Sequence, residues 1–430
     1  MAPPTKPAQV DSAHGPLSPS RSREILKGLE RGGDETNIFS RHLAVEQAVA
    51  GSPLLTGNRV VLLQDGPATY RAMYAAILAA RDHVNMETYI LEDDEVGRRF
   101  ADALIEKQRQ GVQVNLIYDS VGTLGTPDEF FQRLRDSGIR TLEFNPVDPT
   151  TAKSGWDVNQ RDHRKLLIVD GRTVFLGGIN ISSVYSGSSF RRHPRPRVHG
   201  EQPWRDTDLQ IDGPVVAEFQ KLFLATWARQ KGEPLAPRNF FPPLRPAGNE
   251  VVRAIGSSPD DAFSLIYVTL LSAINSAETE VWLTNAYFVP DPQLLAALKA
   301  AAARGVDVRI VVPGSTDSAL VFHAGRSYYE ELLRDGAKIF ERRDALMHSK
   351  TAVIDGVWST VGSTNLDWRS FLHNQEVNAV VLGTEFGDRM RVAFTRDVAQ
   401  STQITLEHWQ RRSPGTKFKE RAARVWQYWL

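Results

Sequence analysis

The chain of 430 residues contains no cysteine, which excludes disulfide bonds, thiolate metal ligands and a cysteine nucleophile. It also has no excess charge of either sign, because 51 Lys and Arg residues balance 51 Asp and Glu residues. A basic surface for nucleic acid or an anionic membrane would therefore have to be local. No apolar run reaches the ~18 residues that a membrane-spanning helix requires. The nearest, residues 262–277, is interrupted by Ser, Thr and Asn and is typical of a buried helix.

The N-terminus also lacks the apolar core of a signal peptide. Together with the absence of a transmembrane segment, this predicts a cytoplasmic location. A lipid substrate would have to be reached from the water side, by peripheral contact with the membrane.

One pattern occurs twice in the chain. Segments 163–180 and 348–365 both read His-x-Lys, four residues, Asp-Gly, five residues, then Gly-x-x-Asn. In a random chain of this length a single His-x-Lys-x4-Asp would occur ~0.05 times, so two copies with the same downstream spacing are not chance. The sequence therefore contains an internal duplication, and the repeated residue types are those of a catalytic site.

Each copy lies in an apolar, β-branched run that ends at Asp-Gly, which predicts a strand followed by a hairpin turn. Residues two apart on a strand point to the same face. His163 should therefore project with Lys165, and His348 with Lys350. Neither copy alone has two imidazoles, but the two halves together supply a nucleophile and an acid/base beside two cations.

The duplication extends beyond the motif. Strand and helix patterns alternate in both halves, and residues 110–116 resemble residues 304–310, so the whole unit was duplicated. This alternation predicts an α/β fold with parallel strands. The expected elements are strands at 60–63, 84–90, 112–118, 280–283 and 306–312, and helices at 70–81, 96–110, 214–231 and 293–304.

Composition divides the chain into an N-terminal arm over residues 1–57, a first repeat over 58–233, a Pro-rich linker over 234–248 and a second repeat over 249–430. Residues 1 to about 35 are rich in Pro, Ser, Gly and charge, so we expect them to be mostly disordered, with a short basic helix at 23–31 as the alternative. The aromatic C-terminus, 426–430, is expected to pack against the body of the protein.

The paired motifs resemble those of the phospholipase D superfamily. Within it, three segments resemble bacterial cardiolipin synthases: Trp-Arg-Asp-Thr at 204–207, the run at 287–291, and Gly-Ser-Thr-Asn-Leu-Asp-x-Arg-Ser at 362–370. The resemblance covers about residues 58–412. It implies two phospholipase D-like α/β repeats, with mixed sheets flanked by helices, packed pseudo-symmetrically around an active site at their interface. It also implies transfer of a phosphatidyl group between phosphatidylglycerol molecules to give cardiolipin and glycerol.

The resemblance further implies a division of roles. His163 would attack phosphorus and form a phosphohistidine, while His348 would protonate the departing alcohol and deprotonate the incoming one. The groups expected to bind the phosphate oxygens are Lys165, Lys350, Asn180 and Asn365, with Ser363 as an additional donor.

Each imidazole used in this way needs a partner on its other nitrogen. Two carboxylates open equivalent strand-like runs after the motifs, Asp206 in the first repeat and Glu376 in the second. We expect Glu376 to orient His348 and Asp206 to orient His163, with Asp208 as the rival for the second role.

Asp170 and Asp355 belong to the catalytic motif but lie at odd offsets from its histidine, at the turn. They are expected to brace the hairpin more than to touch substrate. No metal or other cofactor is expected, because the remaining histidines show no ligand spacing and a lysine stands beside each motif histidine.

The interval from His163 to Asp206 is 43 residues, against 28 from His348 to Glu376. The surplus is the Arg-rich insertion at 186–203, for which a solvated loop and a basic lip for anionic phospholipid headgroups are equally weighted interpretations.

Other functions stay open at this point. The nearest alternative is hydrolysis or headgroup exchange of a phospholipid, since a phosphohistidine accepts any alcohol or water. A nuclease of the same superfamily is disfavoured by the balanced charge, so no nucleic acid partner is expected. A non-catalytic binding module is disfavoured by the intact His and Lys of both repeats. The sequence does not specify an oligomeric state.

Overall fold

The computed structural model describes residues 8–30, 36–49, 51–148, 150, 156–187, 203–316 and 318–425. The strands are β1 Val10–Ser12, β2 Gly15–Pro16, β3 Leu54–Gln64, β4 His83–Thr88, β5 Gln113–Asp119, β6 Arg140–Phe144, β7 Arg161–Asp162, β8 Leu166–Val169, β9 Thr173–Gly177, β10 Trp204–Arg205, β11 Thr207–Asp212, β12 Glu250–Ser257, β13 Glu280–Asn285, β14 Asp307–Pro313, β15 Lys338–Arg342, β16 Leu346–Met347, β17 Lys350–Ile354, β18 Trp358–Gly362, β19 Asn374–Leu382 and β20 Ser401–Ile404.

The α-helices are α1 Pro19–Gly28, α2 Leu43–Val49, α3 Gly66–Ala79, α4 Glu95–Arg109, α5 Asp128–Asp136, α6 Val216–Arg229, α7 Leu265–Ser276, α8 Pro292–Ala303, α9 Ala319–Arg326, α10 Tyr329–Arg334, α11 Trp368–Leu372, α12 Thr384–Ala399, α13 Leu406–Gln410 and α14 Pro414–Val425. A π-helical turn, η1 Ile38–His42, precedes α2, and a 3-10 turn, η3 Ser183–Tyr185, follows the first Gly-x-x-Asn. Helices predicted near 70–81, 96–110, 214–231 and 293–304 correspond to α3, α4, α6 and α8.

The two repeats form sheets with the same strand order. The first runs β6-β5-β4-β8-β9-β11-β3, and the second runs β15-β14-β13-β17-β18-β19-β12, extended at its outer edge by β20. In each, two parallel pairings at one end give way to antiparallel ones at the motif hairpin. The predicted α/β fold with two mixed-sheet repeats is confirmed.

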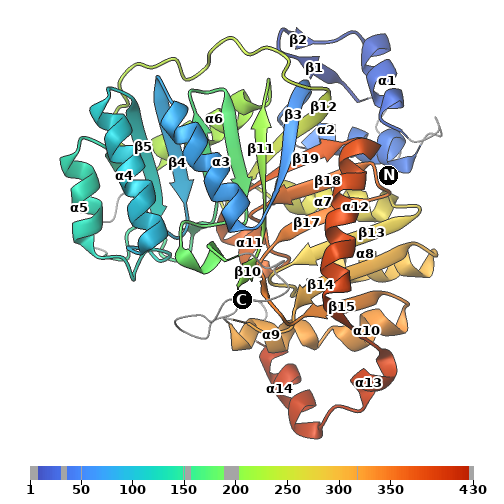
Figure 1. The fold of residues 1–430 in the computed structure, drawn as a ribbon. Coiled ribbons are helices and arrows are strands. Elements are labelled where there is room, and N and C mark those ends of the chain that lie inside the picture. The colour runs from blue at the N-terminus through green and yellow to red at the C-terminus, as the bar shows by residue number, and fades with distance from the viewer. Residues whose placement is uncertain are drawn as a thin grey trace.

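Figure 1 shows the first repeat, in blue to green, beside the second, in yellow to red. Strands β3 and β12 pair antiparallel and join the two sheets. Between the repeats lies a shared apolar core, to which β8, β9 and β11 contribute from one side and β17, β18 and β19 from the other. Its members are mostly Val, Leu and Ile, the residue types that fit a fully buried strand surface. This core fixes the two motif hairpins relative to each other.

The Asp-Gly turns are tight hairpin turns, as the sequence predicts. Strand β8 pairs antiparallel with β9, and β17 with β18. Asp170 has φ 52° and Gly171 has φ 61°, while Asp355 and Gly356 have 50° and 63°. Two successive residues of positive φ are what the central positions of a type I′ turn require, and the Arg172 and Val357 amides close these turns onto the Val169 and Ile354 carbonyls.

The prediction of disorder for most of residues 1 to about 35 is wrong for residues 8–30. These form the hairpin β1–β2 and the helix α1, whose Val10 and Leu26 are buried in the core of the second repeat. Strand β1 also pairs with β3. The segment is poor in apolar residues, but Val10 and Leu26 are buried by the body of the protein, which sequence composition does not reveal. Figure 1 shows the segment, in blue, at the N-terminal edge of the molecule.

Residues 262–277 contain α7, which packs against the second sheet as a buried helix. Within the described part of the chain, no helix is both long and apolar enough to cross a membrane.

Candidate active site

Two short parallel strand pairs cross between the repeats and place the motif histidines. Strand β7 pairs with the start of β19, with Arg161 opposite Asn374 and Asp162 opposite Gln375. The next position in this register brings His163 beside Glu376, and the His163 amide donates to the Gln375 carbonyl at 3.0 Å. The first catalytic motif is therefore anchored on a strand of the second repeat.

The second motif has the equivalent arrangement. Strand β10 pairs parallel with β16, with Trp204 opposite Leu346 and Arg205 opposite Met347. The following residues on the two strands are Asp206 and His348, and the His348 amide donates to the Arg205 carbonyl at 2.8 Å.

These crossings reverse the predicted assignment of the carboxylates. His163 Nδ1 lies 3.0 Å from Glu376 Oε1, and His348 Nδ1 lies 2.7 Å from Asp206 Oδ2. Each imidazole is thus oriented by a carboxylate of the other repeat, and the expectation that each repeat supplies its own partner is wrong. The physical reason is the parallel backbone pairing, which carries the side chains together across the interface. The rival Asp208 contacts neither histidine; its Oδ1 accepts from the Ile179 amide.

Both histidines line one cavity of about 360 Å³. The aromatic rings of Tyr89 and Trp204 form part of its wall, with ring centroids 5.1 Å from His163 and 4.8 Å from His348 respectively. The other lining residues are Ile90, Arg161, Asn180, Tyr287, Val321, Asn365, Asp367, Arg369, Ser370 and Asn374. Two distant motifs therefore share one space, as the duplication implies.

The electrostatics favour a neutral His163. Burial lowers its pKa to about 4, and although Glu376 opposes this shift, the charges of Lys165 and Lys350 reinforce it. Burial alone would raise the pKa of Glu376, but attraction to His163 and Lys165 holds it below its ordinary value. An ionised Glu376 accepts a hydrogen bond from the protonated Nδ1 of His163. The lone pair of the neutral ring is therefore on Nε2.

His348 is in a similar environment. Burial, followed by the charge of Lys350, lowers its pKa, and Asp206 opposes the shift. Its Nδ1 has a second neighbour, the Tyr185 hydroxyl at 3.2 Å. A negatively charged ligand in the cavity would favour the protonated form of His348.

The two motif lysines are buried and lie close enough to influence each other. Each ammonium donates to the carbonyl of its own motif histidine, with Lys165 Nζ 2.6 Å from the His163 carbonyl oxygen. Burial lowers the pKa of Lys165 to about 7, and the charge of Lys350 contributes to the shift against the attraction of Glu376. Two like charges held together in this way are stabilised by an anion.

The two asparagines have unequal surroundings. Asn180 is engaged on both sides, because its Oδ1 accepts from the Ile90 amide and its Nδ2 donates to the Tyr185 hydroxyl. The Oδ1 atom of Asn365 is buried and makes no hydrogen bond within the described residues, although the side chain lines the cavity. Because Oδ1 can only accept, a hydrogen bond from Asn365 to a phosphate oxygen would have to come from its Nδ2 group.

Tyr185 is a site residue that the sequence motifs do not reveal. It immediately precedes the Arg-rich insertion and is fully buried, yet it connects Asn180 to His348. The feature of the sequence that could have identified Tyr185 is its position five residues after Asn180, the last residue of the first motif.

The prediction that Ser363 binds phosphate is wrong. Its side chain is fully buried; the hydroxyl donates to Glu376 and also accepts from the Val377 amide at 3.0 Å. Ser363 thus holds the carboxylate that orients His163. At the equivalent position of the first repeat, a Cβ on Gly178 would lie 2.3 Å from Asp206 Oδ1, so only glycine leaves room for that carboxylate.

Asp170 and Asp355 brace the hairpins, as expected, and do not line the cavity. Asp170 Oδ1 accepts from the backbone amides of Asp82 and His83, at 2.8 and 3.1 Å. Asp355 Oδ1 accepts in the same way from Thr279 and Glu280, at 2.8 and 3.0 Å. Each carboxylate ties its turn to the start of the neighbouring strand, which is a structural role.

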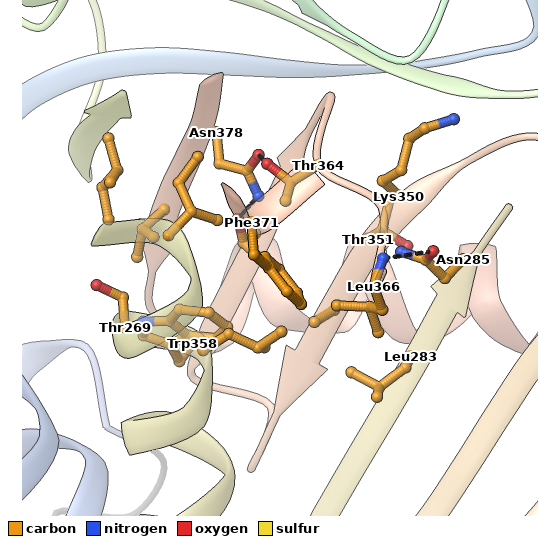
Figure 2. Close-up of a pocket in the computed structure, with 16 residues that line it drawn as sticks. Thr269, Leu283, Asn285, Lys350, Thr351, Trp358, Thr364, Leu366, Phe371 and Asn378 are labelled. Atoms are coloured by element: carbon orange, nitrogen blue, oxygen red, sulfur yellow. Dashed lines mark hydrogen bonds between the residues drawn. The ribbon is translucent and has the colours of Figure 1, made fainter. Parts of the chain in front are cut away.

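A second, much smaller cavity of about 30 Å³ lies between α7 and strands β17 to β19. Figure 2 shows Trp358, Leu366 and Phe371 around it, with the ammonium end of Lys350 directed away from them. Thr364 donates to Asn378 at 2.8 Å, and the Leu366 amide donates to Asn285 at 3.1 Å. These bonds flank Asn365 on both sides and fix it at the edge of the catalytic cavity.

Most of the Arg-rich insertion, 188–202, and the aromatic residues 426–430 lie outside the described residues. The two interpretations of the insertion and the expected packing of the C-terminus therefore stay predictions. Within the described residues, no group of three or more His, Cys, Asp or Glu side chains is arranged to hold a metal ion.

The chain is similar in sequence to several known proteins. Residues 73–189 and 270–398 match a family model described as cardiolipin synthase, PLD-like domain. The chain is 34% identical over 385 residues to the cardiolipin synthase of Geobacillus kaustophilus (strain HTA426), covering 89% of this chain and 74% of the relative. It is 37% identical over 361 residues to cardiolipin synthase A of Pseudomonas entomophila (strain L48), covering 83% and 71%.

A solved structure also has the same fold. The crystal structure of phosphatidylserine synthase from Haemophilus influenzae Rd KW20 superposes with a TM-score of 0.66 at 13% identity, covering 90% of this chain and 100% of that one. At this identity the likeness concerns the fold alone.

Proposed function

The chain belongs to the cardiolipin synthase, phospholipase D-like domain family and is a phosphatidyltransferase of the phospholipase D type, and from this premise we propose that it converts two phosphatidylglycerol molecules into cardiolipin and glycerol through a phosphohistidine. The observation that supports this most directly is the pair of imidazoles in one cavity, each hydrogen-bonded through Nδ1 to a buried carboxylate of the other repeat.

In the first step, His163 Nε2 attacks the phosphorus of one phosphatidylglycerol. The P–N bond forms and the bond from phosphorus to the headgroup glycerol oxygen breaks. His348 gives its proton to that oxygen, so glycerol leaves neutral. The Nδ1 bond to Glu376 stabilises the positive charge that develops on the attacking ring.

In the second step, His348 takes a proton from the headgroup hydroxyl of a second phosphatidylglycerol. That oxygen attacks phosphorus and the P–N bond breaks, which gives cardiolipin and restores His163. The lysine pair and Asn365 would bind the non-bridging oxygens as charge builds up in both transition states. Asn180, which is engaged with Ile90 and Tyr185, would support the His348 side of the cavity.

The protonation states suit this sequence. A pKa of about 4 keeps His163 neutral, and therefore nucleophilic, near pH 7. The phosphodiester charge raises the pKa of His348 on binding, so the acid is created in the presence of its substrate. The assignment of nucleophile and acid to these two residues follows the family resemblance. We further propose that the protein reaches its lipid by peripheral contact with an anionic membrane surface.

The test of activity is incubation of the purified protein with phosphatidylglycerol vesicles in EDTA, followed by mass spectrometry of the lipids. Cardiolipin and released glycerol in equal amounts are expected. Phosphatidic acid as the main product would identify a hydrolase, and cleavage of single-stranded DNA with inert lipid would replace the proposal by a nuclease.

The test of roles uses phosphatidyl-p-nitrophenol, whose leaving group needs no acid. His348→Ala should release one equivalent of p-nitrophenol and retain the phosphatidyl group on His163, whereas His163→Ala should release none. His408→Ala, which removes an exposed imidazole elsewhere, is the matched control and should behave as the wild type. A phosphatidyl group on His348 would reverse the assignment.

A further inference from the structure

The C-terminal helix α14 exposes an apolar stripe to solvent. Phe418, Ala422 and Val425 follow at intervals of four and three residues, which places them on one face of the helix. Phe418 is 73% exposed and Val425 is 79% exposed, the largest values among the exposed large apolar residues of the described chain.

Cationic side chains flank this stripe. Lys419 and Arg421 are exposed and lie on either side of the stripe by helical geometry. Residues 406–425 carry six Lys or Arg against two Glu, although the whole chain is neutral. An apolar stripe bordered by Lys and Arg is the arrangement of a helix that lies in a membrane interface, where the long side chains reach up to the phosphate groups.

The opposite face of α14 is held firmly to the body. Arg424 pairs with Glu331 at 3.0 Å and stacks 4.2 Å over the Tyr328 ring. Glu420 is buried and pairs with Arg412 at 2.9 Å and Arg326 at 3.6 Å. The exposed stripe is therefore not the contact face of a loosely attached helix, because the contact face is already occupied.

The position of α14 relates the stripe to the catalytic cavity. Helix α14 packs along α9, and Val321 of α9 lines the cavity that holds both histidines. Leu320 of α9 is itself 43% exposed. In Figure 1, α9 and α14 lie together at the lower end of the molecule.

We propose that α14 is a docking helix whose partner is the surface of an anionic phospholipid bilayer, with Phe418 and Val425 inserted among the acyl chains and Lys419 and Arg421 at the phosphates. The inference deepens the proposed function and rests on it, since a bilayer bound at α14 presents phospholipid next to the wall of the cavity. Charge complementarity selects anionic over zwitterionic lipid.

Binding is tested by cosedimentation with vesicles of phosphatidylglycerol and of phosphatidylcholine, using the catalytically inactive His163→Ala protein as background. Phe418→Ser with Val425→Ser should weaken binding to phosphatidylglycerol vesicles at least ten-fold. Lys419→Gln with Arg421→Gln should weaken it about thirty-fold at low salt, at about 1 kcal/mol per cationic residue, and leave phosphatidylcholine binding unchanged.

The matched control removes apolar groups of similar exposure elsewhere. Leu78 on α3 and Val392 on α12 are 60% and 61% exposed, and Leu78→Ser with Val392→Ser should bind vesicles as the parent does. Equal binding by the α14 pair and this control would overturn the proposal, as would equal loss in both.

Activity separates docking from catalysis. In the otherwise wild-type enzyme, the α14 apolar pair should lose turnover on vesicles but keep it on short-chain phosphatidylglycerol below its critical micelle concentration. Loss on both substrates would show that α14 supports the fold and would refute docking. Vesicle binding that depends on α14 in a protein that makes no cardiolipin would reject the proposed function and retain the docking helix.

Discussion

Replacement of Glu376 by glutamine tests the crossed arrangement of the site. The glutamine side chain can still accept from His163 Nδ1, so geometry is retained while the charge is lost. A hydrogen bond to a charged group contributes about 1.5–3 kcal/mol and a neutral one about 0.5–1.5 kcal/mol. The difference of about 1–2 kcal/mol falls on the step in which His163 becomes positively charged, which corresponds to a rate lower by about 5- to 30-fold.

The assay is single-turnover release of p-nitrophenol from phosphatidyl-p-nitrophenol, which reports the attack by His163 without an acid. Glu376→Gln should slow this release by that factor. Asp206→Asn, the matched variant at the other carboxylate, should leave it within about three-fold and slow the overall reaction with phosphatidylglycerol, whose leaving group needs His348.

The pH dependence provides a second readout. Glu376 raises the pKa of His163 against the effect of burial, so removal of its charge lowers that pKa below about 4. The acid limb of p-nitrophenol release should therefore move to lower pH in Glu376→Gln. The reasoning is refuted if Asp206→Asn slows the release and Glu376→Gln does not, because that is the result expected when each repeat supplies its own carboxylate.

Ser363→Ala removes the hydroxyl that holds Glu376 and should lower the rate of p-nitrophenol release about ten-fold without changing thermal stability by more than a few degrees. Asp170→Asn and Asp355→Asn should each lower the free energy of unfolding in urea by about 1–3 kcal/mol and leave the activity of the folded enzyme within about two-fold, since both carboxylates bind backbone amides. Burial raises the pKa of Glu87, so folding loses stability as the pH rises; Glu87→Gln should raise the free energy of unfolding at pH 8 and change it little at pH 4.

Each of these three predictions would be contradicted by a specific result. Wild-type release by Ser363→Ala would show that the serine does not orient the carboxylate. A large loss of activity in folded Asp170→Asn or Asp355→Asn would give these residues a part in the chemistry. Equal effects of Glu87→Gln at both pH values would show that the buried carboxyl group does not change protonation on unfolding.

The sequence was sufficient wherever the determinant is local. The Asp-Gly turns, the strands before them and the helices α3, α4 and α8 follow from residue periodicity and turn chemistry over short windows. The duplication also predicted that His163 and His348 share one site, because each half lacks what the other supplies. The bracing role of Asp170 and Asp355 followed from their odd offset on a strand.

What the sequence missed depends on contacts between distant segments. Ser363 aligns with a glycine in a phosphate-binding motif and so suggested a phosphate ligand, but the fold directs it to Glu376. The apolar residues of the N-terminal arm are few, and only the surface of the second repeat makes them a core. Tyr185 belongs to no sequence motif, and only the tertiary structure brings its hydroxyl next to His348.

The composition, the repeat and the motif spacing of this sequence by themselves determined that two imidazoles, two ammonium groups and their hairpins occur in two similar α/β units. Only the tertiary structure decided which carboxylate faces which imidazole. A near-symmetric repeat allows either assignment, and the choice is made by two parallel backbone pairings, β7 with β19 and β10 with β16, which form when the repeats pack together.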